Sequence, residues 1–320
     1  MLKQAIKKLE EKFFLSNPML YETLHEVFKT RPVTAALVSL YMLPVRKLLM
    51  PPEYLTSSSL TLTASTEYYK ELHGLLHIAK AEGYELVRTG QDNDGGYVML
   101  DDFPGGIAYS FGINNDVSWD KDMAARGYDI FMYDHTIDGL PEQNARFHWS
   151  KFGIADGVTH DDRLKDLEEL ISRNGHENQR DMILKMDVEG AEWGFFERVK
   201  SETLSQFSQM TFEFHEVLNA DYTQRILSGL RKINETHQLI HLHANNYCSN
   251  YFTAGGKNFC SSLETSYVLR DKYKLRQDYD VSLPLKVDMP NRKTAPEIEF
   301  GLWNREFQDD GKITSVVREV

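Results

Sequence analysis

The chain has 320 residues, of which 41% are hydrophobic and 26% are charged, and its net charge is −12 at pH 7. These proportions are typical of a globular protein, and the length allows one large domain or one domain with a small accessory segment. The negative charge argues against a general nucleic-acid binder, which would show a basic surface. Cys248 and Cys260 are too few for a disulfide framework, and no secretory signal opens the sequence, so we expect a cytoplasmic protein.

Residues 1–60 are expected to form a helical accessory segment that ends in a linker. Leu2, Ile6, Leu9 and Phe13 have helical spacing, which predicts an amphipathic helix that needs a partner surface and leaves a homodimer open. The run "PPEYLTSSSLTLTAS" is rich in proline, serine and threonine and is typical of a linker.

The uncharged apolar run at residues 32–44 is shorter than the roughly 20 residues that span a bilayer. A buried helix or a docking element is the simpler interpretation. The alternative is an interfacial helix, with Arg46 and Lys47 at lipid head groups, which would give peripheral membrane contact through residues 32–50.

The main domain is expected over residues 61–270. It begins with a predicted helix at 66–82, which Gly83 ends. In "YELVRTGQDNDGGYVML", two apolar runs flank Asp-Gly-Gly, which predicts a hairpin because the glycines accept a positive φ.

Strand-like and helix-like runs alternate from residue 107 onward. The helical patterns are clearest at 161–173 and 219–235. The predicted strands are 107–111, 128–133, 147–151, 182–186, 209–214, 238–243 and 265–270. Such alternation predicts an α/β fold, namely a Rossmann-like, seven-stranded, mostly parallel sheet.

The last two predicted strands are joined without an obvious helix. We therefore expect the last of them to be an antiparallel strand on the edge of the sheet. Residues 271–320, with three spaced prolines, are expected to form a tail packed on the domain.

Ligands of an open α/β sheet bind beyond the carboxyl ends of its strands, so the residues after each strand are the candidate site. Gly112 follows the first strand in "SFGINND", and Asp134 ends the second, where a carboxylate can hold a ribose diol or cap a helix. Asp156 follows the third strand, near the expected place of an adenine. No GxGxxG motif is present, which counts against a nicotinamide dehydrogenase.

Carboxylates and imidazoles follow the next three strands: Asp187, Glu189, Glu192, then Glu213, His215, Glu216, then His241 and His243. Asp187, Glu213, His215 and His243 are candidate ligands of a divalent cation, and this mixed set suits Mn²⁺, Fe²⁺ or Zn²⁺ somewhat better than Mg²⁺. Without a metal, Asp187 or Glu189 would bind an ammonium group, while His215 or His243 acts as a general base. Glu189 and Glu192 also suit the first turn of a helix.

The stretches "AYSFGINNDVSWD", "IFMYDHT", "LKMDVEGAEW" and "FEFHEV", in this order, resemble class I S-adenosylmethionine-dependent methyltransferases. The chain is most similar to the FkbM-like group and the methyltransferase-like-24-type domain, over roughly residues 84–270. The first motif of this family usually has an acidic residue and more glycines than this chain offers.

The resemblance implies S-adenosyl-L-methionine as cofactor and assigns roles to individual residues. Asp187 would lie between cofactor and acceptor, with His215 and His243 as further catalytic residues. The residues that the resemblance implies to bind the cofactor are Arg88, Gly96, Tyr97, Phe111, Gly112, Asn114 and Asp134. Asp156 is an eighth candidate, because of its position after the third strand.

Family members mostly methylate hydroxyl groups, often on sugars, glycolipids or secondary metabolites. We therefore expect O-methyl transfer to a small-molecule or glycan acceptor, with or without a divalent cation (Mn, Mg or Fe). A metal-dependent hydrolase that uses the same carboxylates and a non-catalytic interaction protein remain the alternatives.

Overall fold

The computed structural model describes residues 65–248 and 250–317. The chain divides into two units, residues 1–63 and 64–320, and the described residues all belong to the second. The predictions for residues 1–60, including the amphipathic helix and the run at 32–44, lie outside the described residues. Among the described helices, none is long and apolar enough to cross a membrane.

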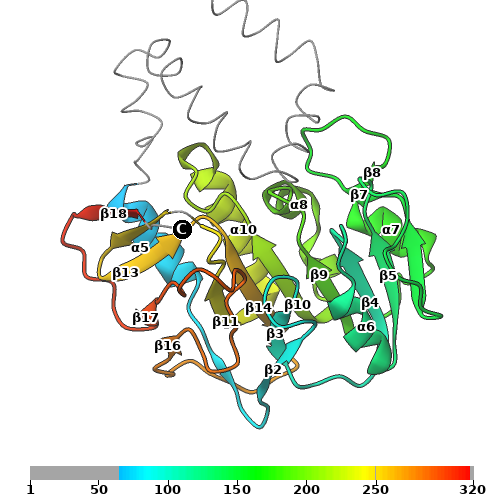
Figure 1. Ribbon diagram of the computed structural model, residues 1–320, viewed down its shortest axis with the longest axis horizontal. Coiled ribbons are helices and arrows are strands. Elements are labelled where there is room, and N and C mark those ends of the chain that lie inside the picture. Colours follow the sequence, from blue (N-terminus) through cyan, green and yellow to red (C-terminus); the bar gives the residue numbers. More distant parts are fainter. Residues whose placement is uncertain (1–64, 249, 318–320) are drawn as a thin grey trace, which may run out of the picture. The chain divides into compact units, whose positions relative to one another are not determined.

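A seven-stranded, mostly parallel sheet forms the centre of this unit (Figure 1). Its strand order is β11-β14-β10-β9-β4-β5-β6. The strands are β4 (Gly106–Phe111), β5 (Tyr128–Tyr133), β6 (Phe147–Ser150), β9 (Met182–Met186), β10 (Phe207–Phe214), β11 (His237–Ala244) and β14 (Leu263–Leu269). All seven strands predicted from the sequence are confirmed, with ends that shift by at most two residues.

The sequence predicted the antiparallel strand at the edge of the sheet, and this prediction is wrong: the strand lies inside the sheet. β14 pairs antiparallel with both β10 and β11, so β11 forms the edge. The chain passes from β10 through helix α10 (Thr223–Thr236) to β11 and then returns through the gap between them. Pairing on both sides gives β14 backbone partners along both of its edges, which a strand at the edge of the sheet would lack.

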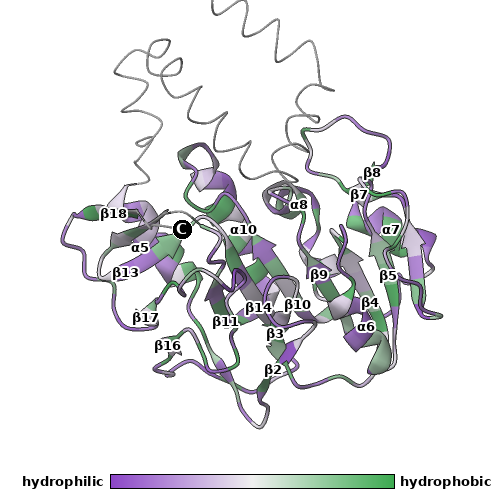
Figure 2. Cartoon of the chain, viewed as in Figure 1, coloured by the Kyte–Doolittle hydropathy of each residue, from purple (hydrophilic) through white to green (hydrophobic). Residues whose placement is uncertain are grey.

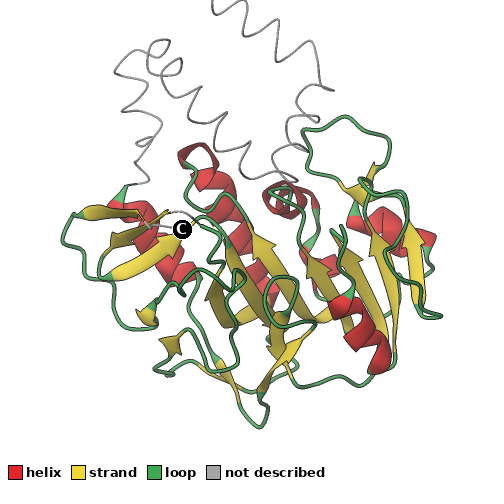
Figure 3. Ribbon diagram, viewed as in Figure 1, coloured by secondary structure: helices red, strands yellow, loops and turns green. Residues whose placement is uncertain are grey.

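Helices cover the sheet where apolar residues repeat at helical spacing. They are α5 (Thr66–Leu75), α6 (Ser118–Ala125), α7 (Leu167–Arg173), α8 (Glu192–Arg198), α9 (Ser201–Leu204) and α10, with a 3-10 turn at Ala220–Tyr222. α8 and α10 lie side by side (Figure 3), where Gly229 faces the Phe196 ring. Phe196 in turn packs on Phe212 of β10, which places both helices over the Phe212 face of the sheet.

Three predicted helices begin or end elsewhere. The first ends at Leu75, because residues 80–81 form strand β1, which pairs with β15 (Leu275–Arg276). The helix predicted at 161–173 begins at Leu167, because β8 (Leu164–Lys165) pairs with β7 (Gly153–Ile154). The helix predicted at 219–235 starts as a 3-10 turn.

The predicted hairpin is confirmed and covers the opposite face of the sheet. β2 (Leu86–Thr89) pairs with β3 (Tyr97–Leu100), and the Gln209 side chain of β10 bonds to the backbone of Leu100. The remaining strands form small sheets at the periphery: β12 (Asn250–Ala254), β13 (Lys257–Cys260) and β18 (Ile313–Val317), and the pair β16 (Ser282–Leu283) and β17 (Gly301–Leu302).

Hydrophobic residues, green in Figure 2, occur along the central strands. Every residue of β9, β10 and β11 is buried, as expected for strands covered on both faces. The polar residues within these strands are therefore the unusual ones, and two of them, Lys185 of β9 and Glu213 of β10, border the candidate site.

The strand order reverses between β4 and β9, because the chain runs from β4 to β5 and β6 and then crosses back to β9. Gly112 follows β4 with φ +74°, and a Cβ added to it would lie 1.6 Å from the carbonyl oxygen of Asp187, which follows β9. Only glycine allows both this backbone angle and this approach.

We predict that Gly112→Ala destabilises the domain by about 3 kcal/mol or more, because the strained φ and the overlap with Asp187 act together. Chemical denaturation measures the change in the free energy of unfolding. Gly139→Ala is the matched control, since nothing lies within 4 Å of its added Cβ. Equal stability of the two variants would contradict the prediction.

Candidate functional site

Two cavities meet beyond the carboxyl ends of β4 and β9. The hairpin cavity, of about 540 Å³, is bordered by the β2–β3 turn, and the β5 cavity, of about 800 Å³, by the residues after β5. They share four residues of their walls: Gly112, Asn114, Asp187 and Glu189. This is the place where open α/β sheets bind ligands.

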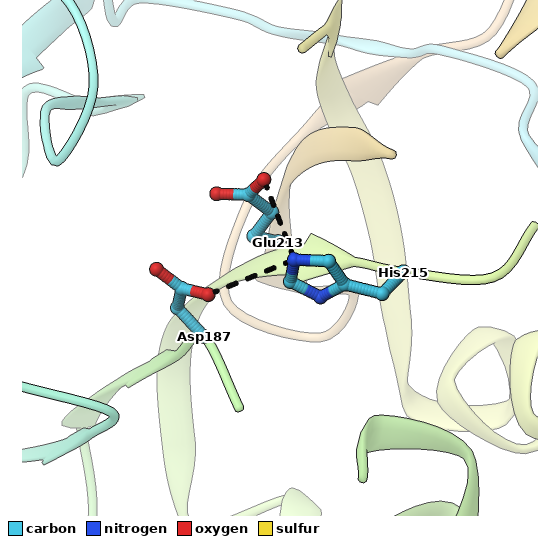
Figure 4. A group of neighbouring side chains, drawn as sticks. All are labelled: Asp187, Glu213 and His215. Atoms are coloured by element: carbon cyan, nitrogen blue, oxygen red, sulfur yellow. Dashed lines mark ion pairs between the residues drawn. The ribbon is translucent and has the colours of Figure 1, made fainter. Parts of the chain in front are cut away.

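The carboxylate–imidazole cluster, formed by Asp187, Glu213 and His215, lies in the wall of the hairpin cavity (Figure 4). The Nε2 atom of His215 lies 3.5 Å from Glu213 Oε1 and 4.0 Å from Asp187 Oδ1. One ligand atom from each of the three residues falls within 4.8 Å of the others, which is close enough for all three to bind one metal ion.

Glu192 orients His215. The Nδ1 atom of His215 lies 3.1 Å from Glu192 Oε1, so Nδ1 carries a proton and Nε2 is the atom that faces the other two carboxylates. Glu192 also accepts hydrogen bonds from the backbone N–H groups of Val188 and Gly190, both 3.0 Å long. These bonds close the turn in "DVEGAEW" and give the fully buried Glu192 carboxylate its partners.

The two other members of the cluster are also held from outside it. Tyr97 of the hairpin donates its hydroxyl to Asp187 Oδ2 at 3.0 Å. Asn245 and Ser262 donate to Glu213 Oε1 at 2.6 and 2.7 Å. Such outer partners fix the orientation of groups that bind a metal or transfer a proton.

The cluster has strongly perturbed acidity. Burial and the charge of Asp187 raise the pKa of Glu213 to about 8. Burial alone would lower the pKa of His215, but the hydrogen bond and charge of Glu192, with the charges of Glu213 and Asp187, raise it to about 10. His215 is therefore an imidazolium at neutral pH, and it offsets the repulsion among the carboxylates.

His243 does not join this cluster, although the sequence placed it among the catalytic residues and the metal ligands. Its Nδ1 lies 2.9 Å from Glu264 Oε2 and its Nε2 lies 3.2 Å from Glu297 Oε2, and only 1% of its surface is exposed. Glu264 lies opposite both Glu213 and His243 in the sheet register. The inserted strand β14 thus separates His243 from Glu213.

Of the residues expected to bind the cofactor, Gly112 and Asn114 border both cavities, and Asp134 and Asp156 border the β5 cavity. Both oxygens of Asp134 are already occupied. Oδ2 accepts from the backbone of Ile113 and Asn114, and Oδ1 accepts from the N–H and hydroxyl of Thr136. A ribose would have to replace the Thr136 hydroxyl.

The other four residues expected at the cofactor border neither cavity. Arg88 lies inside the hairpin turn, where it donates to the carbonyls of Gln91 and Asn93, and a Cβ on Gly96 would lie 2.8 Å from its Nε. Phe111 is fully buried and its ring stacks on that of Tyr133. Tyr97 acts on the site through Asp187.

Lys185 borders the hairpin cavity and was missed by reasoning from the sequence. The signal was present, since a lysine in the buried strand "MILKM" needs a polar partner.

No protein-family model and no curated protein matches the chain. Among solved structures, one titled "Putative hemolysin from Streptococcus thermophilus" matches with a TM-score of 0.28 and 9% sequence identity. The match covers 52% of this chain and 59% of that one, so this chain spans less than two thirds of its length. A likeness of this size carries no argument about function.

We predict that Glu192→Gln lowers the pKa of His215 by about one unit or more, because the variant lacks the charge that contributes most to raising it. NMR titration of labelled imidazoles measures the shift. Glu189→Gln is the control: Glu189 Oε2 lies 3.7 Å from Nε2, but its side chain is 87% exposed and solvent screens its charge. A larger shift in the control would contradict the prediction.

The same pKa gives stability a pH dependence. Because the folded-state pKa of His215 lies above the ordinary value of 6.5, its contribution is complete below pH 6.5 and is lost as the pH rises toward 10. In Glu192→Gln this loss should be complete at a lower pH, which urea unfolding between pH 6 and pH 10 would show.

We predict that His243→Gln destabilises the domain by about 3 kcal/mol, because it leaves the buried Glu264 carboxylate without its cationic partner. Thermal or chemical unfolding measures the loss. The control His148→Gln changes a half-exposed histidine 3.9 Å from Asp129 and should cost much less. If His243→Gln were as stable as this control, His243 would not be needed to compensate the charge of Glu264, and the prediction would be wrong.

Proposed function

We propose that the protein is an S-adenosylmethionine-dependent O-methyltransferase that acts on a hydroxyl of a sugar, glycan, glycolipid or similar small metabolite. The observation that carries the proposal is the carboxylate–imidazole cluster at the reversal of strand order, in the wall of the hairpin cavity, which shares Gly112 and Asp187 with the β5 cavity.

The carboxylates that border the two cavities complement the positive charges of S-adenosylmethionine. The hairpin cavity is bordered by Asp94 and Asp116, whose carboxylates suit a sulfonium and an ammonium group. The β5 cavity adjoins it and supplies Asp134 and Asp156 for the adenosine part. Asp134 fits this role only if the Thr136 hydroxyl turns away from it.

S-adenosylmethionine would supply a methyl group activated by the sulfonium. The chain must hold the acceptor hydroxyl in line with that methyl group and take up the hydroxyl proton. Asp187 is the residue for this task, since it borders both cavities and its Oδ2 is fixed by Tyr97. His215, oriented by Glu192, would accept a proton once the positive charge of a ligand has lowered its pKa.

A divalent cation at the cluster is compatible with the same activity. Asp187, Glu213 and His215 offer two oxygens and one nitrogen, a set that suits Mn²⁺ or Fe²⁺, and a bound cation would lower the pKa of an acceptor hydroxyl. The same ligands support the alternative of a metal-dependent hydrolase, which would not bind S-adenosylmethionine. His243 is not part of this set.

Calorimetric titration with S-adenosylmethionine, on metal-free protein and again with Mn²⁺, tests the proposal. We expect binding in both conditions. Absence of binding in both would overturn the proposal, and Mn²⁺ binding alone would favour the hydrolase.

We predict that Asp187→Asn lowers methyl transfer by about 100-fold or more while cofactor binding persists, because the amide cannot accept the proton. Transfer is measured with labelled S-adenosylmethionine and a panel of monosaccharides and glycolipids. Asp138→Asn, at a side chain that is 97% exposed, is the control. Unchanged transfer in Asp187→Asn would show that Asp187 does not accept the hydroxyl proton.

A further inference from the structure

Lys185 is a buried cation, one residue before the carboxyl end of β9. Its side chain belongs to a strand in which every residue is buried, and only 6% of its surface is exposed. Burying an ammonium group costs free energy unless hydrogen bonds or opposite charges compensate it. The exposed remainder borders the hairpin cavity.

The chain itself satisfies this ammonium only in part. Nζ donates to the carbonyl of Gly112 at 2.7 Å and lies 3.5 Å from that of Phe111. It also lies 5.6 Å from the centre of the Tyr97 ring, a favourable contact for a cation. Within the described part of the chain, Lys185 has no ion pair at 4.0 Å or less, so its charge lacks a directly bound anion.

The surroundings of Lys185 have the opposite sign. Asp94, Asp116 and Asp120 border the same cavity, and Lys185 is its only lysine or arginine among the described residues. The other cation that borders this cavity, His215, already lies 3.1 Å from Glu192 and 3.5 Å from Glu213. An anionic ligand group would therefore be attracted to Lys185, and a cationic group elsewhere in the cavity. An α-amino acid carries both groups, a carboxylate and an ammonium, a few bonds apart.

We infer that Lys185 binds the carboxylate of an α-amino-acid group, that is, of the methionine part of the methyl donor. The inference rests on the proposed function and deepens it by assigning a residue to that part of the cofactor. Lys185 reaches the cavity from β9 and bonds to Gly112 of the turn after β4. A carboxylate on Lys185 would thus lie next to the strand ends that form both cavities.

Two ligands and two proteins test the inference as a cycle. S-adenosylmethionine and its decarboxylated form differ only in the carboxylate, and Lys185→Met removes the ammonium while keeping an unbranched side chain as long as lysine's up to Cε. We expect the wild-type protein to bind S-adenosylmethionine about tenfold or more tightly than the decarboxylated form, as for one charge-assisted hydrogen bond. In Lys185→Met this preference should disappear.

The control variant is Lys121→Gln. Lys121 is an exposed lysine on α6 that pairs with Glu142, so this variant should keep the preference for S-adenosylmethionine over its decarboxylated form. Lys185→Gln is the second variant if Lys185→Met does not fold, and thermal unfolding verifies both. Lys185→Arg retains the charge and should retain part of the preference.

Each outcome has one meaning. A wild-type protein that binds both ligands equally, or a Lys185→Met protein that still prefers the carboxylate, overturns the inference and leaves the proposed function standing. Equal weakening of both ligands in Lys185→Met also overturns it, since Lys185 would then only hold the turn at Gly112. A wild-type protein that binds neither ligand overturns the proposed function itself.

Discussion

The close approach of Gly112 to Asp187 is the constraint on which the site depends. It joins the end of β4 to the end of β9 where the strand order reverses between the two halves of the sheet. The backbone N–H of Asp187 donates to the Phe111 carbonyl, and Lys185 donates to that of Gly112, so the two strand ends are bonded as well as adjacent. Both cavities take part of their walls from this junction.

The crowding of carboxylates after β9 is resolved by giving each a different environment. Glu192 is buried and bonded to two backbone N–H groups and to His215, while the Glu189 side chain is mostly exposed. Asp187 stands between them at the cavity wall, with one oxygen fixed by Tyr97. The repulsion that remains is offset by His215, which makes the cluster sensitive to any further positive charge.

A second buried group of charges attaches the C-terminal segment to the sheet. Glu297 and Asp288 of this segment bond to His243 and His241 of β11, and Asn291 bonds to Glu264 of β14. These residues occupy the sheet face that the hairpin covers elsewhere. The polar residues on β11 thus hold the chain end in place, whereas those at the end of β10 and after β9 face a cavity.

The sequence by itself determined the strands, the hairpin and the residues that follow β9 and β10. These depend on local patterns: apolar runs of strand length, the Asp-Gly-Gly turn, and polar residues at strand ends. The charge pattern of "DVEGAEW" and "FEFHEV" likewise predicts a cluster that includes Asp187, Glu213 and His215, which lie close together in the fold.

Only the tertiary structure decided which strand ends are neighbours. Strand order depends on long-range pairing, and no local pattern showed that β14 enters between β10 and β11. That one insertion places Glu264 between Glu213 and His243 and so removes His243 from the cluster. The partners of Arg88, Asp134 and Lys185 also escaped prediction, because a buried polar side chain bonds to whichever group the fold brings to it.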